Sequence, residues 1–436
     1  MNELRRSIGL VRATAIVVGI IIGASIFVQP SQVTGAISSE TGVLGVWLMA
    51  GLLTLIGALV IAELSSAWPQ TGGVYVFLKN AYSPVVGFLW GWAMFWTMHT
   101  GIVAIIAMVC ARYVGSFIEL SDTGIRVVAI VAVAVLSAVN YVGVKQASAV
   151  QATLTLIKVA ACILIVGMAF LAGGSPAAAA GTAMPNVTLP RIVTAMIAGL
   201  FAFGGWHMVS YSAEETINPT KTIPRALVLG TLTVTVLYVA LNASYLHVLS
   251  VDQVSKSTRV AADLADAVFH GGNWARIVSF FVILSTLGAA NGVILAGPRV
   301  YLAMAQDGML FKQIAHIHPV FRTPSRAVVL QGIWAAVLIA TNSYRTLFTR
   351  VVYTEWIFFA MLAGALYFLR RRAGYAPAYR FPGFRVWCAI FVASSATIVI
   401  TEIVTKPQET GTGLLLVLSG LPVYYFWSRK RLTFRS

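Results

Sequence analysis

The sequence has 436 residues, of which 58% are hydrophobic and only 10% are charged, and its mean hydropathy is +0.85. A water-soluble protein must cover its surface with polar side chains, so this composition excludes a soluble protein and indicates an integral membrane domain. A net charge of +16 would favour nucleic acid as the partner of a soluble protein. Here the lipid bilayer is the expected partner instead, and no nucleic acid is expected.

Twelve apolar runs are each long enough to form a membrane-spanning helix, which predicts an all-α integral membrane fold. In chain order they cover about residues 14–37, 44–66, 85–115, 126–142, 150–172, 192–213, 226–248, 276–304, 326–341, 350–369, 386–404 and 412–427. The connections between them are short, so residues 1–436 are expected to form a single domain. The first run is long and no small-x-small cleavage site follows it, so no cleaved signal peptide is expected.

The basic residues are unevenly distributed over these connections. If the N-terminus lies inside and the chain crosses twelve times, twenty of the 30 Lys and Arg residues fall on the cytoplasmic side, nine fall outside, and Lys158 falls within a run. Such an excess is the positive-inside pattern. We therefore expect a multi-pass protein of the cell's inner (plasma) membrane with both termini in the cytoplasm.

The chemistry-bearing residue types are sparse. Cys110, Cys162 and Cys388 all lie in apolar runs, so no disulfide framework is expected. His and Cys show no metal-ligand spacing, and the glycine-rich phosphate-binding patterns are absent. No metal, no cofactor and no enzyme activity are expected, and any transport would be driven by gradients.

Two of the runs are interrupted by residues that break helices. They read GIIIGASIFVQP at 19–30 and LFAFGGWHMVSY at 200–211. Five runs extend from each break, over about 14–172 and 192–369, and the runs at 386–404 and 412–427 follow. Because five is odd, the second set must enter the membrane in the opposite orientation. This 5+5 inverted repeat with broken first and sixth helices is typical of secondary transporters.

A helix break within lipid needs a polar partner. Unwinding leaves backbone N–H and C=O groups unpaired, at a cost on the order of several kcal/mol each, unless a substrate or cavity satisfies them. Free N–H groups favour a carboxylate and free carbonyls favour an ammonium, and an α-amino acid carries both. The alternative is that the glycines only permit close helix packing.

Four segments, in order, resemble the amino acid–polyamine–organocation superfamily and its L-type amino acid transporter branch. They are GIIIGASIFVQP (19–30), AELSSAWPQTGGVY (62–75), LFAFGGWHMVSYSAEETINPTKTIPRAL (200–227) and STLGAANGVILAGPRVYLAMAQDGML (285–310). The resemblance covers nearly the whole chain. It implies a LeuT-type fold with twelve transmembrane helices, alternating access, and sodium-independent exchange of amino acids.

The resemblance also implies how a substrate carboxylate is bound. The branch uses backbone amides of the unwound first helix, which are here those of Gly23, Ala24 and Ser25. The usual motif has glycine where Ser25 stands. Backbone recognition survives this change, but the serine takes space, which favours small neutral substrates.

Further site residues follow from the same resemblance. The substrate α-amine is expected on the carbonyls of Ile21, Phe201 and Gly204, and Phe201 matches the aromatic ring that closes over the substrate from outside. Tyr238 matches a tyrosine that the branch places between substrate and a lysine, or it is a core tyrosine. Ser285 faces either the site or another helix.

Two ionisable residues are candidates for special roles. Lys158 lies in the fifth run, and a lysine at this depth is expensive and indicates function, unless it snorkels to the surface. The resemblance places it where sodium-coupled relatives hold a cation, which implies a fixed charge that ties the fifth helix to the first and eighth. Glu355 lies in the tenth run. The resemblance implies that it borders the pocket for the substrate side chain, where it would select polar or cationic groups or take a proton. The alternative is a residue at the outer end of the helix that pairs with Arg350 or is simply hydrated.

Several functional alternatives remain open. The protein could be a proton-coupled amino acid importer, a cationic amino acid or polyamine antiporter, or, in a different class, a substrate-sensing membrane receptor. The branch also includes subunits joined by a cysteine to a glycoprotein. The corresponding loop, SFIELSDTG at 116–124, has no cysteine, so no covalent glycoprotein partner is expected.

Overall fold

The computed structural model describes residues 4, 6–23, 25–173, 188–269, 273–341 and 344–433. Over these residues the fold is all-helical, and the only strand-like pairing is an isolated bridge between Ile8 and Thr216. Hydrogen bonds from the Ser7 and Ile8 amides to the Glu215 carbonyl accompany the bridge. The segment before the first helix is therefore attached to the end of the second interrupted region.

The first part of the chain forms ten helical elements. These are α1 (Leu10–Ile21), η1 (Ser25–Phe27), α2 (Gln29–Ala36), α3 (Glu40–Ala67), α4 (Val74–Ala81), α5 (Pro84–Ala93), η2 (Met94–Met98), α6 (His99–Val114), α7 (Asp122–Val142) and α8 (Val144–Leu171). Serine side chains begin several of them: Ser39 accepts a hydrogen bond from the Gly42 amide and Ser121 from the Gly124 amide. These caps satisfy N–H groups that have no acceptor within the helix.

The second part of the chain forms α9 (Leu189–Ala202), η3 (Trp206–Glu215), α10 (Pro219–Val248), α11 (Val251–Lys256), α12 (Val260–Phe269), α13 (Trp274–Ala296), α14 (Pro298–Gln306), η4 (Lys312–Ala315), α15 (Ser325–Thr341), α16 (Tyr344–Leu369), α17 (Phe384–Thr405), α18 (Pro407–Leu418) and α19 (Gly420–Thr433). All twelve apolar runs of the sequence fall on helical segments. Nine helices in the described part of the chain are long and apolar enough to cross a membrane. The multi-pass character is thus clear, whereas the count of twelve spans stays a prediction.

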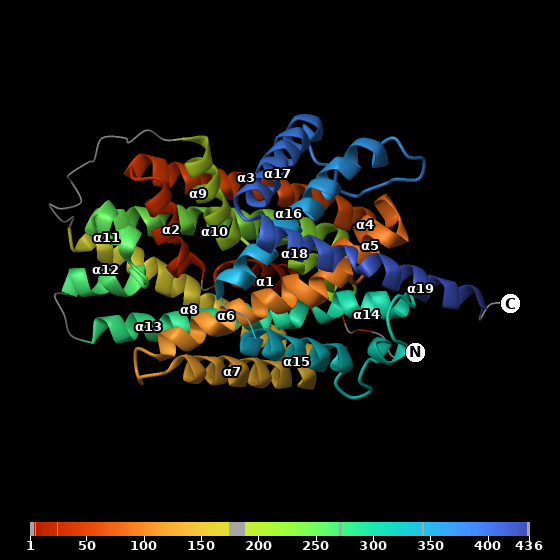
Figure 1. Cartoon of the computed structure of the whole chain (residues 1–436), viewed down its shortest axis with the longest axis horizontal. Helices are drawn as coiled ribbons and strands as arrows, with labels where there is room; N and C mark the ends of the chain where they lie inside the picture. Colours follow the sequence, from red (N-terminus) through yellow and green to blue (C-terminus); the bar gives the residue numbers. More distant parts are fainter. Residues whose placement is uncertain are drawn as a thin grey trace.

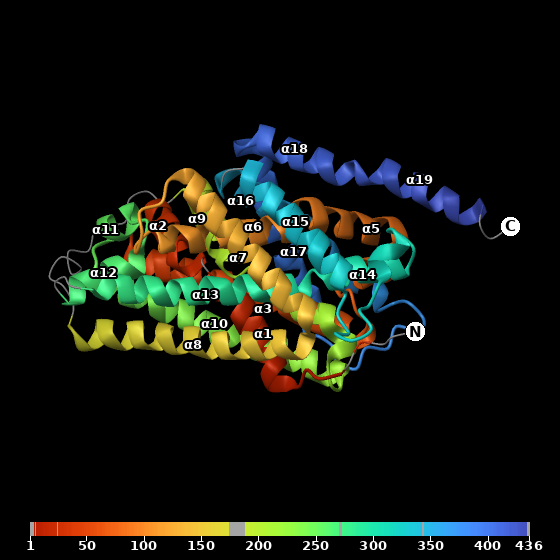
Figure 2. The same cartoon turned by 90° about the horizontal axis from the view of Figure 1, so that it is seen from below.

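The long helices run side by side along the long axis of the molecule (Figure 1). The short helices α11 and α12 lie at one end of the bundle, and α14 and α19 lie toward the other, where the described N-terminal segment also begins (Figures 1 and 2). Within the bundle α1 packs against α8, α10 and α13, and α3 packs against α10. This arrangement places the end of α1 deep among other helices rather than against lipid.

In the described part of the chain, three acidic residues form ion pairs with basic residues distant in the sequence. Glu63 of α3 is fully buried and accepts hydrogen bonds from Arg370 and from the Phe381 amide, at 2.9 Å from Arg370 Nε and 2.7 Å from the amide. Glu215 pairs with Arg299 of α14, and Asp307 pairs with Lys79 of α4. Burial, and then the Glu63 carboxylate, raise the pKa of the Tyr375 hydroxyl in the loop that follows α16. These pairs attach the ends of α3, η3 and α14 to other helices and to the loop that follows α16.

Candidate functional site

The two interruptions predicted from the sequence lie against each other. Helix α1 ends at Ile21 and the chain resumes as η1 at Ser25, while α9 ends at Ala202 and the chain resumes as η3 at Trp206. Gly205 opens η3 with φ +90°, a conformation that side chains with a Cβ rarely adopt. A Cβ on Gly205 would lie 2.3 Å from Ile20 Cγ2. The second break therefore needs glycine for its backbone conformation and for its close approach to α1.

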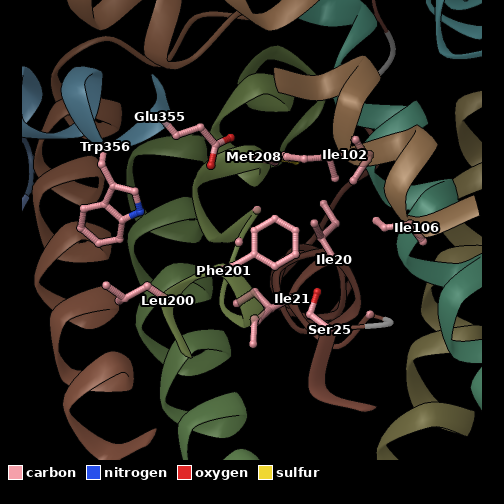
Figure 3. Close-up of a pocket in the computed structure, with 15 residues that line it drawn as sticks. Ile20, Ile21, Ser25, Ile102, Ile106, Leu200, Phe201, Met208, Glu355 and Trp356 are labelled. Atoms are coloured by element: carbon pink, nitrogen blue, oxygen red, sulfur yellow. The ribbon is translucent and has the colours of Figure 1, made fainter. Parts of the chain in front are cut away.

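A small cavity lies where the breaks meet. The space within it that the centre of a water-sized sphere can occupy is about 40 Å³. This is enough for more than one water molecule but leaves no large open chamber. Six of the predicted site residues line it: Ile21, Gly23, Ser25, Phe201, Gly204 and Glu355. In Figure 3 the Glu355 carboxylate and the Ser25 hydroxyl lie on opposite sides of the Phe201 ring. The remaining wall is apolar.

Lys158 is buried in α8, with 1% of its surface exposed, so its side chain does not reach the surface of the protein. Its Nζ donates to the carbonyls of Gly19 at 2.8 Å, Ile22 at 2.7 Å and Ser285 at 3.0 Å. All three ammonium hydrogens therefore have acceptors. The side chain lies behind the break rather than in the cavity, and it connects α8 to the end of α1 and to α13.

Tyr238 and Ser285 support the same break from other helices. The Tyr238 hydroxyl of α10 lies 2.8 Å from the Ile21 carbonyl and 3.1 Å from the Ala202 carbonyl, so one proton is shared between the two breaks. Ser285 Oγ of α13 donates to the Ile22 carbonyl over a long 3.4 Å. Neither residue lines the cavity. The structure therefore places both residues behind the backbone of the breaks, where they contact carbonyl groups, rather than on the cavity wall where a substrate-binding residue was expected.

Among the described residues that line the cavity, Glu355 has the ionisable side chain. Its side chain comes from α16 and is 6% exposed, and its Oε1 has no hydrogen-bond partner among the described residues. A buried carboxyl oxygen without a partner is costly, because burial removes its hydration. The side chain of Arg350, considered as a partner above, lies outside the described side chains, as does residue Ala24 of the predicted carboxylate site.

The sequence reading missed the apolar residues that shape the cavity. Ile102 and Ile106 come from α6, Met208 from η3 and Trp356 from α16. Isoleucine and methionine are ordinary residues of a membrane helix, so only their positions in the folded bundle distinguish them. For Trp356 alone a local signal existed, because it directly follows Glu355, which was already a candidate site residue.

Comparison with known proteins now identifies the family. The family described as amino acid permease matches residues 8–425, which is nearly the whole chain. This chain belongs to the amino acid permease family. That family is part of the amino acid–polyamine–organocation superfamily, so the protein is a membrane transporter and not an enzyme.

Individual relatives of this permease are amino acid exchangers and transporters. The serine/threonine exchanger SteT of Bacillus subtilis (strain 168) is 31% identical over 99% of this chain and 98% of its own length. The b(0,+)-type amino acid transporter 1 of Mus musculus is 30% identical over 98% of this chain and 88% of its own. The cystine/glutamate transporter of Homo sapiens is 27% identical over 99% of this chain and 88% of its own.

The permease also contains a buried polar network behind α1. Asn140 of α7 donates to Asn291 of α13 at 2.8 Å, and Asn291 donates to Gln151 of α8 at 3.0 Å. The Thr155 hydroxyl, one turn after Gln151, lies 3.0 Å from the Ala15 carbonyl, to which it can donate a hydrogen bond. These contacts join α7, α8 and α13 into one unit that faces the broken helix.

Proposed function

We propose that this permease exchanges small neutral L-amino acids across the cell's inner membrane, without sodium, by alternating access. The observation that carries the proposal is the small cavity at the meeting point of two interrupted helices. Backbone groups freed by such breaks match the two charged groups of an α-amino acid. We place the carboxylate on the amides of Gly23, Ala24 and Ser25, and the α-amine on free carbonyls at the two breaks.

The position of Lys158 supports sodium independence. In transporters built on broken helices, carbonyls of the unwound segments are typical ligands of coupling sodium ions. Here an ammonium group already binds the carbonyls of Gly19, Ile22 and Ser285. The fixed charge does the electrostatic task of a bound cation, so no sodium is required at this place.

The cavity wall supports the choice of substrate. The small volume of the cavity, together with the Ser25 side chain and the Phe201 ring, leaves little space for a large substrate side chain. The single unpartnered carboxyl oxygen of Glu355 favours a small side chain with a hydrogen-bond donor, and the name of the serine/threonine exchanger among the relatives agrees with this chemistry.

The proposed topology is the LeuT-type 5+5 inverted repeat, with repeats at about 14–172 and 192–369 followed by two further helices. The paired breaks in α1 and in the α9–η3 region support it. We assign both termini to the cytoplasm, because the described N-terminal segment and α19 lie toward the same end and the basic loops favour that side.

Uptake into proteoliposomes tests this function. Vesicles loaded with unlabelled alanine or with buffer are given radiolabelled alanine in choline medium, and protein-free liposomes are the control. We expect uptake only when internal alanine is present and no change when sodium replaces choline. Uptake into empty vesicles would instead identify net transport, and binding without any flux would identify a receptor.

A second candidate substrate class, cationic amino acids or polyamines, is favoured by Glu355 alone. Its carboxylate would then bind a positive side chain within the cavity. Competition separates the classes: unlabelled serine and alanine should inhibit alanine exchange, while arginine and putrescine should not. Strong inhibition by arginine that is lost in Glu355→Gln would establish the cationic class instead.

A further inference from the structure

A second hollow, separate from the substrate cavity, is a groove on the surface of the bundle between α7 and α15. These two helices pack against each other along the lower edge of the view in Figure 1. The space that the centre of a water-sized sphere can occupy is about 460 Å³ in the groove, compared with about 40 Å³ in the substrate cavity. The proposed exchange of amino acids gives this larger space no role.

The groove is apolar and has small residues along both of its helices. Ala134 and Ala138 line it from α7, and Gly332 and Ala336 line it from α15. A Cβ on Gly332 would lie 2.7 Å from Ser137 Oγ, so the helices approach each other closely at this glycine. Larger apolar residues form the rest of the lining, and several of them are exposed. The result is a narrow apolar groove on a surface that faces lipid.

The groove has the length of one leaflet of a bilayer. Its lining residues on α7 extend from Ile130 to Val142, which corresponds to about 18 Å of helix. Half of the hydrocarbon core of a bilayer is about 15 Å thick, whereas a helix that crosses the whole core must be about 30 Å long. The groove therefore fits a single lipid acyl chain better than a transmembrane helix of a partner.

One end of the groove is closed by the loop that precedes α15. The ring centroid of Tyr141, a lining residue near the end of α7, is 5.6 Å from that of His318 and 6.0 Å from that of Phe321. The Thr323 hydroxyl donates to the Tyr141 carbonyl at 2.8 Å. Tyrosine is enriched where the apolar core of a bilayer meets the headgroups. This end of the groove is therefore the place at which a lipid headgroup is expected.

Two exposed arginines lie at the same end. Arg326 is in the first turn of α15, three residues before the lining residue Val329 and so on the same face of the helix. Arg322 has a φ of +56°, which is uncommon for a residue other than glycine, and its amide donates to the His318 carbonyl at 2.9 Å. This tight turn fixes Arg322 beside the loop residues that contact Tyr141.

These two arginines have no acidic partner. Neither forms an ion pair within the described part of the chain, and Arg326 donates instead to the neutral Gln313 carbonyl at 3.2 Å. No acidic residue occurs in residues 123–213 or 308–354, which include all of α15 and nearly all of α7. At the opposite end of the groove, Arg126 donates to carbonyls in the last turn of α15. The positive charge available to a ligand is therefore at the end with Arg322 and Arg326.

We propose that this groove binds an anionic phospholipid of the bilayer, with one acyl chain between α7 and α15 and the headgroup phosphate on Arg322 and Arg326. Guanidinium groups bind phosphate oxygens with charge-assisted, often bidentate hydrogen bonds. A zwitterionic headgroup has no net charge, so it binds less strongly to two arginines. On the topology proposed above, the site faces the cytoplasmic leaflet, where basic pockets between membrane helices bind anionic headgroups.

Native mass spectrometry of the full chain in detergent tests the headgroup site. The protein is mixed with equal amounts of phosphatidylglycerol and phosphatidylcholine that carry the same acyl chains, and the first bound lipid is identified. The test variant is Arg322→Gln/Arg326→Gln. The matched control is Arg225→Gln/Arg371→Gln, which removes the same charge from two exposed arginines on α10 and after α16.

A second pair of variants tests the acyl-chain site in the same assay. Ala134→Phe places a ring in the groove. Val135→Phe is its control, because Val135 is the next residue of α7, is 56% exposed and does not line the groove. Both positions are on the surface of the bundle, so neither ring disturbs the core.

We expect the wild type and the arginine control to bind phosphatidylglycerol about tenfold in preference to phosphatidylcholine. Arg322→Gln/Arg326→Gln should bind both lipids equally, and Ala134→Phe should bind several-fold less of either lipid than Val135→Phe. If the double arginine variant does not fold, Arg326→Gln should still show a weaker preference than the wild type.

Three results would overturn the inference: equal binding of the two lipids by the wild type, an unchanged preference in the arginine variants, or equal lipid binding by the two phenylalanine variants. A wild-type dimer that dissociates in Ala134→Phe would also overturn it, because the groove would then hold a second copy of the chain. The assay contains no amino acid, so its outcome does not depend on the proposed exchange function.

Discussion

The two helix breaks are stabilised in different ways. At the first break the carbonyls of Gly19, Ile21 and Ile22 accept hydrogen bonds from side chains of three other helices, α8, α10 and α13. At the second break the Ala202 carbonyl lies near such a donor, the Tyr238 hydroxyl, and the backbone depends on glycine at position 205. The first break is therefore held by hydrogen bonds and charge, and the second by shape.

This difference predicts that the first break is more sensitive to substitution than the second. Donors from several helices hold the first break to the surrounding bundle, so a change there should disturb the site most. At the second break the contact of Gly205 with Ile20 is steric. Substitutions at each break, taken in order of expected effect, test this contrast.

Lys158→Ala should have the largest effect. It removes the donor to three buried carbonyls, and an unsatisfied buried group costs about 1–3 kcal/mol, so exchange should fall by about 100-fold or more. The measurement is alanine exchange per folded protein. Lys256→Ala is the control, because Lys256 is 74% exposed and pairs only with Asp252 on the surface. Normal exchange by Lys158→Ala would refute the role of charge at the first break.

Gly205→Ala should be the next most severe. The methyl group requires a backbone conformation that costs roughly 1–2 kcal/mol in residues with a Cβ, and it collides with Ile20, so we expect about tenfold slower exchange. Adding Ile20→Val should not restore the exchange rate, because the strained backbone conformation at position 205 remains. Gly167→Ala on α8 has open space around it and should behave as the wild type. Equal rates for the two alanine variants would show that the second break does not depend on shape.

Tyr238→Phe should have a moderate effect. It removes one hydrogen bond shared by the breaks, worth about 1 kcal/mol, so exchange should slow by about fivefold. Tyr245→Phe is a close control on the same helix, because the buried Tyr245 hydroxyl has no partner in the described part of the chain. If both variants exchange alike, the hydroxyl of Tyr238 does not couple the two breaks.

Ser285→Ala should have the smallest effect. Its hydroxyl is 3.4 Å from the Ile22 carbonyl, which Lys158 already binds at 2.7 Å. We therefore expect less than about a twofold change in exchange rate. A large loss in this variant, with Ser244→Ala unchanged as the control, would show that Ser285 contacts the substrate rather than the backbone.

Much of the fold could be predicted because lipid imposes simple rules on a sequence. Apolar runs of sufficient length must be helices, and glycine-rich interruptions in two of them indicated the breaks near residues 22 and 205. The short helices α4, α11 and α12 were not predicted, because they lie in the connections where no such rule applies. For Lys158 the sequence left burial and snorkelling to the surface both open, and the structure shows the side chain buried.

The sequence by itself determined that this is an all-helical membrane protein of the amino acid permease family with two interrupted helices, because hydrophobic length and helix-breaking residues act locally. Only the tertiary structure decided what those interruptions contact. It placed Tyr238 and Ser285 behind the backbone, brought Glu355 to the cavity, and brought His99 of α6 against Tyr211 of η3. Side-chain contacts between helices distant in the chain depend on packing, which no local pattern encodes.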